Sequence, residues 1–191
     1  MRSLDEDVGQ LISRLREPRG MSAGGGDPFY YIPYEPGDTF EVRRLLPAWE
    51  GRLRNAGYEP VRASFSRLLW ELIDESGRWD LWLEIEREGD TDPEELNASI
   101  QSVLHDDERL IERVARVIGS APPNGVVLLT DTEALHPFFR VRGLESRLHD
   151  RVTAPTVVFY PGRRVGQYGL RFLELYPEDS NYRATIIGGL P

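Results

Sequence analysis

The stretch that decides the fold runs from residue 126 to residue 140 and reads Val126-Val-Leu-Leu-Thr-Asp-Thr-Glu-Ala-Leu-His-Pro-Phe-Phe-Arg140. Residues 126–129 form an unbroken apolar run. A strand with one face in water would alternate apolar and polar residues, so this run predicts a strand buried on both faces, as in a parallel sheet covered by helices. The polar residues 130–133 follow at its carboxyl end, the edge where open α/β sheets tend to bind ligands and partners.

A second apolar run, residues 156–160, predicts a neighbouring central strand, which we expect to end at Pro161-Gly162. Working outward from these two strands, the same reasoning predicts further elements on both sides. Strands are expected at residues 28–34, 58–65, 170–175 and 181–187. Apolar residues at helical spacing predict helices at residues 5–16, 38–55, 66–75, 78–88, 93–104, 110–118 and 134–148, with a strand as the alternative for residues 78–88.

Local signals refine two of these helices. Pro47 should kink the second helix or split it, and Asp38 with Glu41 is expected to form a capping box at its start. Pro137 is expected in the first turn of the helix at 134–148. The simpler interpretation of the polar residues after the central strand is that they only cap that helix.

Together these patterns predict an α/β fold with a central, mainly parallel sheet of about five strands flanked by helices. A helical insert at approximately residues 78–120 separates the second and third strands. The length of 191 residues fits one domain. Residues 1–191 are therefore expected to form a single α/β domain.

Composition removes several classes of chemistry. The chain has no cysteine, which excludes disulfides, thiolate nucleophiles and cysteine-bound metals. All 23 basic residues are arginine, so the chain can supply neither the lysine of a P-loop nor the amine of a Schiff base. The net charge of −9 disfavours general affinity for nucleic-acid backbones. Because no apolar run is long enough for a membrane span and no secretory signal is recognisable, we expect a cytoplasmic protein.

No motif defines a cofactor or metal site. The three histidines are too far apart for a metal-binding pair on one helix. A hydrolytic site built on Asp131, Glu133 and His136 would need further ligands from distant segments. The glycines in residues 19–27 follow a helix and precede a strand, which is the reverse of the order in a phosphate-binding loop. The chain is therefore predicted to have no catalytic residue, no cofactor and no metal.

Two groups of side chains are candidates for binding a partner. Trp79 and Trp82 lie in an aromatic segment, and tryptophan is enriched at interaction hot spots, although a place in the core is the simpler explanation. Arginines gather in the last third, where they could form a basic face for phosphate, nucleic acid or an acidic partner, or pair internally with carboxylates. The candidate partner-binding residues are Trp79, Trp82, Asp131, Thr132, Arg140, Arg163, Arg164 and Arg183.

Four blocks of sequence carry a family resemblance. They are Asp27-Pro-Phe-Tyr-Tyr-Ile-Pro-Tyr-Glu-Pro-Gly-Asp38, Val127-Leu-Leu-Thr-Asp131 with His136-Pro-Phe-Phe-Arg140, Val158-Phe-Tyr-Pro-Gly162, and Asp179-Ser-Asn-Tyr-Arg-Ala184. In this order, over nearly the whole chain, the blocks resemble the BrxB family of BREX phage-defence systems. The chain departs from the family pattern at Asp131, where members typically have glycine. It departs again at Arg163 and Arg164, where the family loop is typically more acidic.

The resemblance implies a non-enzymatic component of a multi-protein bacterial system that blocks phage replication and methylates host DNA. It also implies other BREX proteins as partners, first a PglZ-type protein of the alkaline-phosphatase superfamily, with nucleic acid reached only through the complex. The leading hypothesis is an adaptor that uses the carboxyl edge of the central strands and residues 79–82. The alternatives are a nucleotide- or nucleic-acid-binding module that uses the arginine-rich last third, and a metal-dependent hydrolase.

Overall fold

The computed structural model describes residues 3–17, 28–88, 92–105, 108–179 and 182–188. The glycine-rich segment at 19–27 and most of the carboxyl-terminal tail lie outside these ranges. The helices are α1 (Leu4–Leu15), α2 (Thr39–Asn55), α3 (Phe65–Glu75), α4 (Trp79–Glu88), α5 (Pro93–His105), α6 (Arg109–Gly119) and α7 (Val141–Leu148), with short 3-10 turns η1 (Pro36–Asp38) and η3 (Thr132–Leu135). The strands are β1 (Phe29–Tyr34), β2 (Glu59–Ser64), β3 (Gly125–Thr130), β4 (Thr156–Val165), β5 (Gly169–Phe172) and β6 (Thr185–Ile186).

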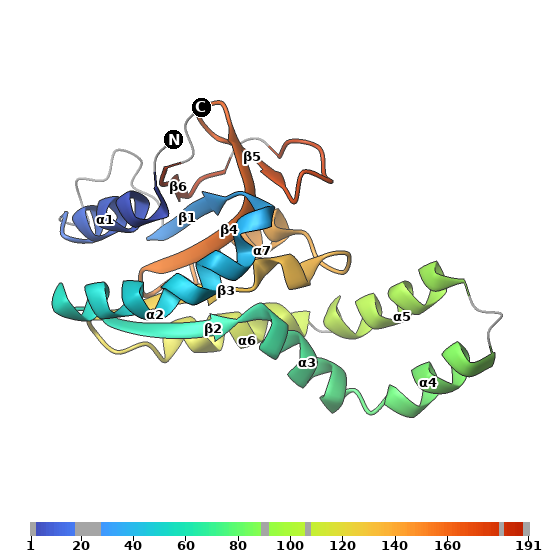
Figure 1. Ribbon diagram of the computed structural model, residues 1–191. Coiled ribbons are helices and arrows are strands. Elements are labelled where there is room, and N and C mark those ends of the chain that lie inside the picture. Colours follow the sequence, from blue (N-terminus) through green and yellow to red (C-terminus); the bar gives the residue numbers. More distant parts are fainter. Residues whose placement is uncertain (1–2, 18–27, 89–91, 106–107, 180–181, 189–191) are drawn as a thin grey trace.

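The sheet has the order β2-β3-β4-β1-β6, and these five strands are parallel (Figure 1). β5 pairs in antiparallel fashion with the carboxyl-terminal half of β4. The predicted α/β class and mainly parallel sheet are confirmed. The expectation that the strands at 126–129 and 156–160 are neighbours is also confirmed, because β3 and β4 pair directly.

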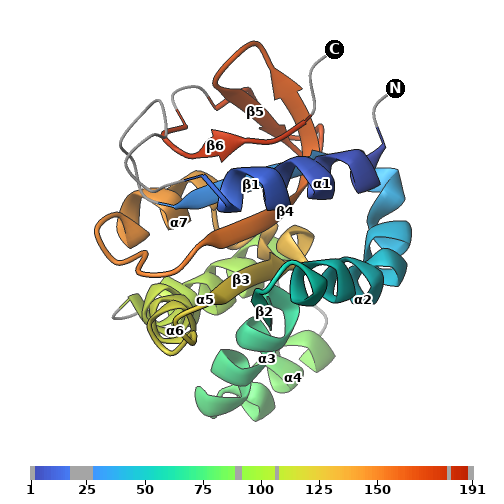
Figure 2. The same ribbon diagram turned by 90° about the vertical axis from the view of Figure 1, so that its left-hand side faces the viewer.

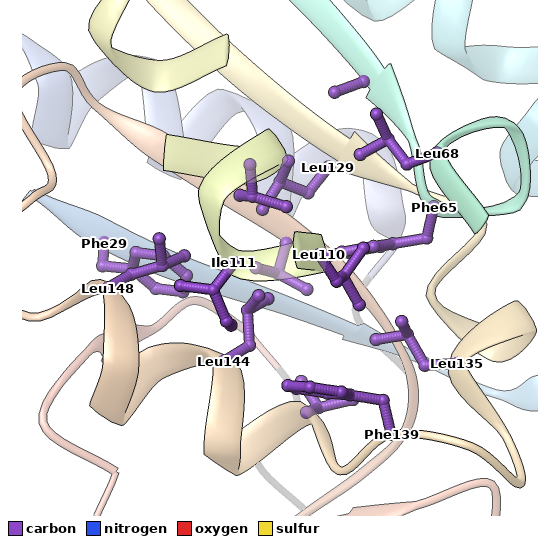
Figure 3. Packing of buried hydrophobic residues seen from close by; sticks show 14 of the residues in the cluster. Phe29, Phe65, Leu68, Leu110, Ile111, Leu129, Leu135, Phe139, Leu144 and Leu148 are labelled. Carbon is purple, nitrogen blue, oxygen red and sulfur yellow. The ribbon is translucent and has the colours of Figure 1, made fainter. Parts of the chain in front are cut away.

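Helices cover both faces of this sheet (Figure 2). α1 and α2 pack on one face with Ile32, Val126 and Phe159, and α3, α6 and α7 pack on the other face with Val127 and Leu129. Figure 3 shows side chains of α6 and α7 converging with those of α3 on the second face. All six residues of β3 are buried, so the unbroken apolar run reflects burial on both faces, as predicted.

The helical insert between the second and third strands is present, and its helices take two different places. α6 lies on the sheet, where Leu110, Ile111 and Val114 are completely buried. α4 and α5 instead project beyond the sheet and form a small core of their own with the end of α3 (Figure 1). None of the helices in the described part of the chain is long and apolar enough to cross a membrane.

The predicted helix at 134–148 is wrong in its first half. Residues 132–135 form the turn η3, His136 is extended with ψ of 136°, and α7 begins only at Val141. The reason is that the ring of Pro137 disfavours helical backbone at the residue before it. The expected place of Pro137 in a first helical turn is therefore also wrong.

Pro161-Gly162 does not end the second central strand, contrary to expectation. Pro161 pairs with Tyr34 of β1, and the strand then continues to Val165 by pairing with β5. A Cβ at position 162 would overlap the carbonyl oxygen of Arg171, so glycine is what allows β5 to approach. Strand β4 therefore changes partners at this dipeptide and continues.

Helix α2 continues through Pro47 and is not split. Pro47 is exposed, so the carbonyl that loses its helical partner faces water. The expected capping box is also wrong: Asp38 makes no side-chain cap, because it ends η1 with non-extended backbone, and the Glu41 carboxylate binds Arg44 at 2.8 Å instead.

The two last strands are shorter than predicted. β5 ends at Phe172 because Leu173 and Glu174 turn the chain with positive φ angles. β6 contains only two residues, which extend the sheet beyond β1.

A buried tyrosine cluster joins segments that are far apart in the sequence. The Tyr31 ring lies 5.7 Å from that of Tyr160 and 5.1 Å from that of Tyr182, measured between centroids. The carboxylate of Glu145, on α7, accepts hydrogen bonds from the backbone N–H groups of Arg183 (2.8 Å) and Ala184 (3.1 Å). Burial raises the pKa of Glu145 and the pKa of all three tyrosines. Three of the four sequence blocks therefore meet inside the fold.

We expect Glu145→Gln to fold at least as stably as the parent chain at pH 8, because the amide oxygen can accept the same two bonds without burying a charge. A raised folded-state pKa means that the carboxyl favours the fold below its unfolded-state pKa and loses this contribution as pH rises through its folded-state pKa. The advantage of Glu145→Gln over the parent should therefore grow from pH 4 to pH 8. Glu145→Ala should lose about 1–3 kcal/mol, since two backbone donors lose their acceptor. Urea unfolding at several pH values measures both effects, and an advantage that shrinks with rising pH contradicts the assignment.

Candidate functional site

The most distinctive surface feature is an apolar groove of about 360 Å³ between α3 and the projecting helices. Its wall comes from α3, α4, α5 and the loop after β3. We call it the tryptophan groove, and its apolar lining consists of Leu69, Trp70, Ile73, Trp79, Trp82, Leu83, Leu96, Ile100, Ala134 and Phe138. Contiguous exposed apolar surface of this kind marks interaction sites on folded proteins.

The three tryptophans have different degrees of burial. Trp82 is only 4% exposed, and its indole N–H donates to the Ser99 hydroxyl at 2.9 Å, which links α4 to α5. Trp79 donates to the carboxylate of Asp74 at 2.7 Å and stacks on Trp70 at 5.5 Å between ring centroids. Trp70 is 53% exposed. Trp82 thus holds the projection together, as the core interpretation predicted, whereas Trp70 is open to a partner.

A second hollow, of about 480 Å³, lies beside the groove at the carboxyl ends of β2 and β3. We call it the polar hollow, and its lining includes Arg43, Arg62, Ser64, Arg67, Thr130 and Asp131. Each of these arginines is bonded to a carboxylate: Arg43 to Asp131 and Glu133 (both 2.8 Å), Arg62 to Glu50 (2.6 Å) and Arg67 to Glu71 (2.9 Å). The positive charge of this edge is therefore largely neutralised.

Two side chains, Ser66 and Trp70, line both hollows. The two surfaces that the sequence suggested separately, the edge after β3 and the segment around Trp79, are therefore adjacent. The loop after β3 contributes directly to both, through Asp131 on one side and Phe138 on the other. The structure combines them into one continuous surface.

Neither Asp131 nor Thr132 caps a helix. Asp131 adopts a left-handed conformation with φ of 55°, makes no side-chain cap and instead binds Arg43. Thr132 is completely buried, and its hydroxyl donates to the carbonyl of Phe159 at 2.7 Å. The capping interpretation is therefore wrong. Asp131 lies at the polar hollow, whereas Thr132 ties β3 to β4 and is out of a partner's reach.

None of the four candidate arginines of the last third lines either hollow. Arg163 forms a two-pronged ion pair with Glu174, at 2.7 and 2.6 Å. Arg164 donates to the backbone carbonyls of Gly166, Gln167 and Gly188. The Arg140 guanidinium lies 3.9 Å from the centre of the Tyr176 ring, and Arg183 is exposed beside the tyrosine cluster. Internal contacts thus account for most of these side chains, so the basic-face interpretation gains no support from the structure.

The hydrolase alternative also gains no support from the site. Arg43 bridges Asp131 and Glu133, in the place where a metal ion would have to bind both. His136 is directed to the hydroxyl of Tyr176. In the described ranges, no group of three or more His, Asp or Glu side chains is arranged to hold a metal ion.

Sequence reasoning missed several residues of this surface, chiefly Trp70, Leu83 and Arg43. Trp70 could have been found from the sequence, because it falls on the outer side of a helix whose inner face is Leu68, Leu69 and Leu72. A large aromatic residue on the outer side of a helix indicates a possible binding surface. Arg43 had none, since its partners Asp131 and Glu133 are about ninety residues away in the chain.

The fold and these hollows define a three-layer α/β protein with a helical projection that carries an apolar groove. The family model of the BREX protein BrxB matches residues 61–187, about two thirds of the chain. The chain therefore belongs to the BrxB family and is a component of a BREX phage-defence system. Comparisons with curated proteins and with solved structures gave no match.

The buried hydrogen bond of Thr132 gives a test of its structural role. Thr132→Val keeps the shape of the side chain but leaves the Phe159 carbonyl without its donor, so we expect a loss of about 1–3 kcal/mol in the free energy of unfolding. The exposed Thr185→Val is the control and should change stability by less than about 0.5 kcal/mol. Chemical denaturation measures both variants. Unchanged stability of Thr132→Val would show that the hydroxyl is available for another purpose.

Proposed function

We propose that this BrxB-family protein is a non-enzymatic adaptor that binds another component of its defence system through the tryptophan groove. The observation that carries the proposal is the exposed apolar surface along α3 and the projecting helices. Leu83 is 41% exposed and Trp70 is 53% exposed, and both line the groove. Each side chain is already about half buried, so covering the rest against a partner contributes about 0.5–1.5 kcal/mol each, and contiguous exposed apolar surface of this kind marks an interaction site.

The projection is also suited to binding without disturbing the sheet. Its small core of Ile73, Trp82 and Val103 lies beyond the two cores that enclose the strands, and α5 joins it to one of them through Ile100. A partner can therefore cover the groove while the sheet keeps its packing. Aromatic side chains in an apolar depression are the usual anchors of protein interfaces.

The partner we propose first is the PglZ-type protein of the same system, which the family resemblance implied. Support for a protein partner comes from the character of the surface, because the groove is apolar and the neighbouring arginines are paired with carboxylates. The polar hollow would then form the rim of the same interface, with Asp131 at its edge. Contact with nucleic acid would occur through the assembled complex.

Two leucines of α4 provide a matched test. Leu83 lines the groove, whereas Leu81, two residues earlier and 51% exposed, does not. We expect Leu83→Glu to lower recovery of the co-encoded partner by at least about tenfold in a pull-down from the native operon, because it places a charge at the centre of an apolar contact. Leu81→Glu should recover the partner like the parent chain.

Circular dichroism and thermal unfolding of both variants establish that the fold is intact. Equal recovery of every co-encoded component by parent, Leu83→Glu and Leu81→Glu would remove the groove as the binding surface. Substrate turnover by the purified chain would remove the non-enzymatic role.

A further inference from the structure

The negative charge of the chain is concentrated on the projection. Residues 78–105 contain eight acidic residues and two arginines, which gives −6 of the total formal charge of −9. The remaining 163 residues together carry only −3. The electrostatic character of the protein is therefore that of a nearly balanced sheet layer with a strongly acidic helical projection.

Ion pairing follows the same division. Several carboxylates of the sheet and its covering helices are paired with arginine, for example Glu50 with Arg62, Glu112 with Arg151 and Glu174 with Arg163. On α4 and α5, by contrast, Asp80, Glu84, Glu86, Glu94 and Glu95 are exposed and form no ion pair with any residue that the structure describes. Of these carboxylates, Glu86 lines the tryptophan groove, and the others lie on the same two helices.

The shape of the groove selects the kind of segment that can fill it. Its sides are the surfaces of α3, α4 and α5, and α4 contributes Trp79, Trp82, Leu83 and Glu86, which lie on one face at helical spacing. An apolar groove between helices is the typical receptor for the apolar face of an amphipathic helix. A volume of about 360 Å³ accommodates a few anchoring side chains of such a helix.

We propose that the occupant of the tryptophan groove is a basic amphipathic helix of the partner protein. Its apolar face fills the groove, and its Lys or Arg side chains face the unpaired carboxylates of α4 and α5. This inference rests on the proposed adaptor function and adds the chemistry of the partner segment. Charge complementarity excludes anionic occupants, since an acidic peptide, a nucleic acid or an anionic lipid surface would be repelled by the same rim.

The first experiment measures binding of the co-purified partner to the full-length chain at two salt concentrations. The rim variant Glu84→Gln/Glu86→Gln removes two exposed charges of α4, of which Glu86 lines the groove, and Glu35→Gln/Glu59→Gln removes two exposed charges from the sheet layer as a matched control. We expect the rim variant to bind about three- to tenfold more weakly at low salt and to lose part of the salt dependence of the parent. The control variant should bind like the parent.

The second experiment identifies the bound segment directly with overlapping peptides that cover the partner's sequence. The peptide retained by the parent chain, and not by Leu83→Glu, should carry net positive charge and gain helical circular dichroism on binding. A retained peptide that is acidic, neutral or extended overturns the proposal, and so does a rim variant that binds as tightly as the parent.

Different results would contradict the adaptor function and the basic helix as occupant of the groove. If the partner binds and Leu83→Glu abolishes binding, but the rim variant and added salt have no effect, the adaptor function stands and the basic helix is wrong. If Leu83→Glu retains the partner, the groove itself is wrong. Sedimentation of the chain alone tests a second copy as occupant: a dimer that Leu83→Glu dissociates would overturn the basic helix.

Discussion

Burial of β3 on both faces is the constraint on which the rest of the structure depends. A strand whose six residues are all buried needs a neighbour on each edge and a helical layer on each face. β2 and β4 supply the edges, and α2 and α6 belong to the two layers. Because the strands are parallel, their carboxyl ends meet at one edge. This geometry brings the residues after β3 next to the start of α3 and so places the polar hollow beside the tryptophan groove.

Hydrophobic periodicity in the sequence was sufficient to predict the α/β class, the neighbouring central strands and the helical insert. Prolines account for two of the differences between the prediction and the structure, at Pro137 and Pro161, and Pro47 shows a third effect. Pro47 is tolerated inside α2 because it faces water, Pro137 delays α7 because it follows an extended residue, and Pro161 lies where β4 exchanges β1 for β5. The local effect of proline is the same in all three places. Whether a proline ends a helix or strand depends on which segments pack against it in the folded chain. A single sequence does not contain that information.

Residues of the candidate surface could be predicted where the residue type alone indicates binding. They could not be predicted where ion pairs with distant carboxylates decide whether a side chain is available. Trp79 was identified because large aromatic residues are informative wherever they lie. The sequence left open whether the arginines face a partner or pair internally, since a guanidinium is available to a partner only if no internal carboxylate binds it. Arg163 forms an ion pair with Glu174 across a hairpin, and Arg43 forms an ion pair with Asp131 at the edge of the sheet. These partners become neighbours only through tertiary packing, so counting arginines along the chain overestimated the basic surface.

Total charge also gives an incomplete account of what this protein can bind. The value of −9 is mostly the charge of a 28-residue projection, and the sheet layer that remains is close to neutral because its arginines and carboxylates neutralise one another. A protein with its charges spread evenly would repel anions from every side, whereas this one concentrates the repulsion around an apolar groove. In the proposed adaptor, apolar contact would supply affinity at the tryptophan groove, and the acidic charge of the projection would reject segments of the wrong charge. Because the projection's core lies beyond the strands, a partner could cover this surface without displacing the side chains that pack on the sheet.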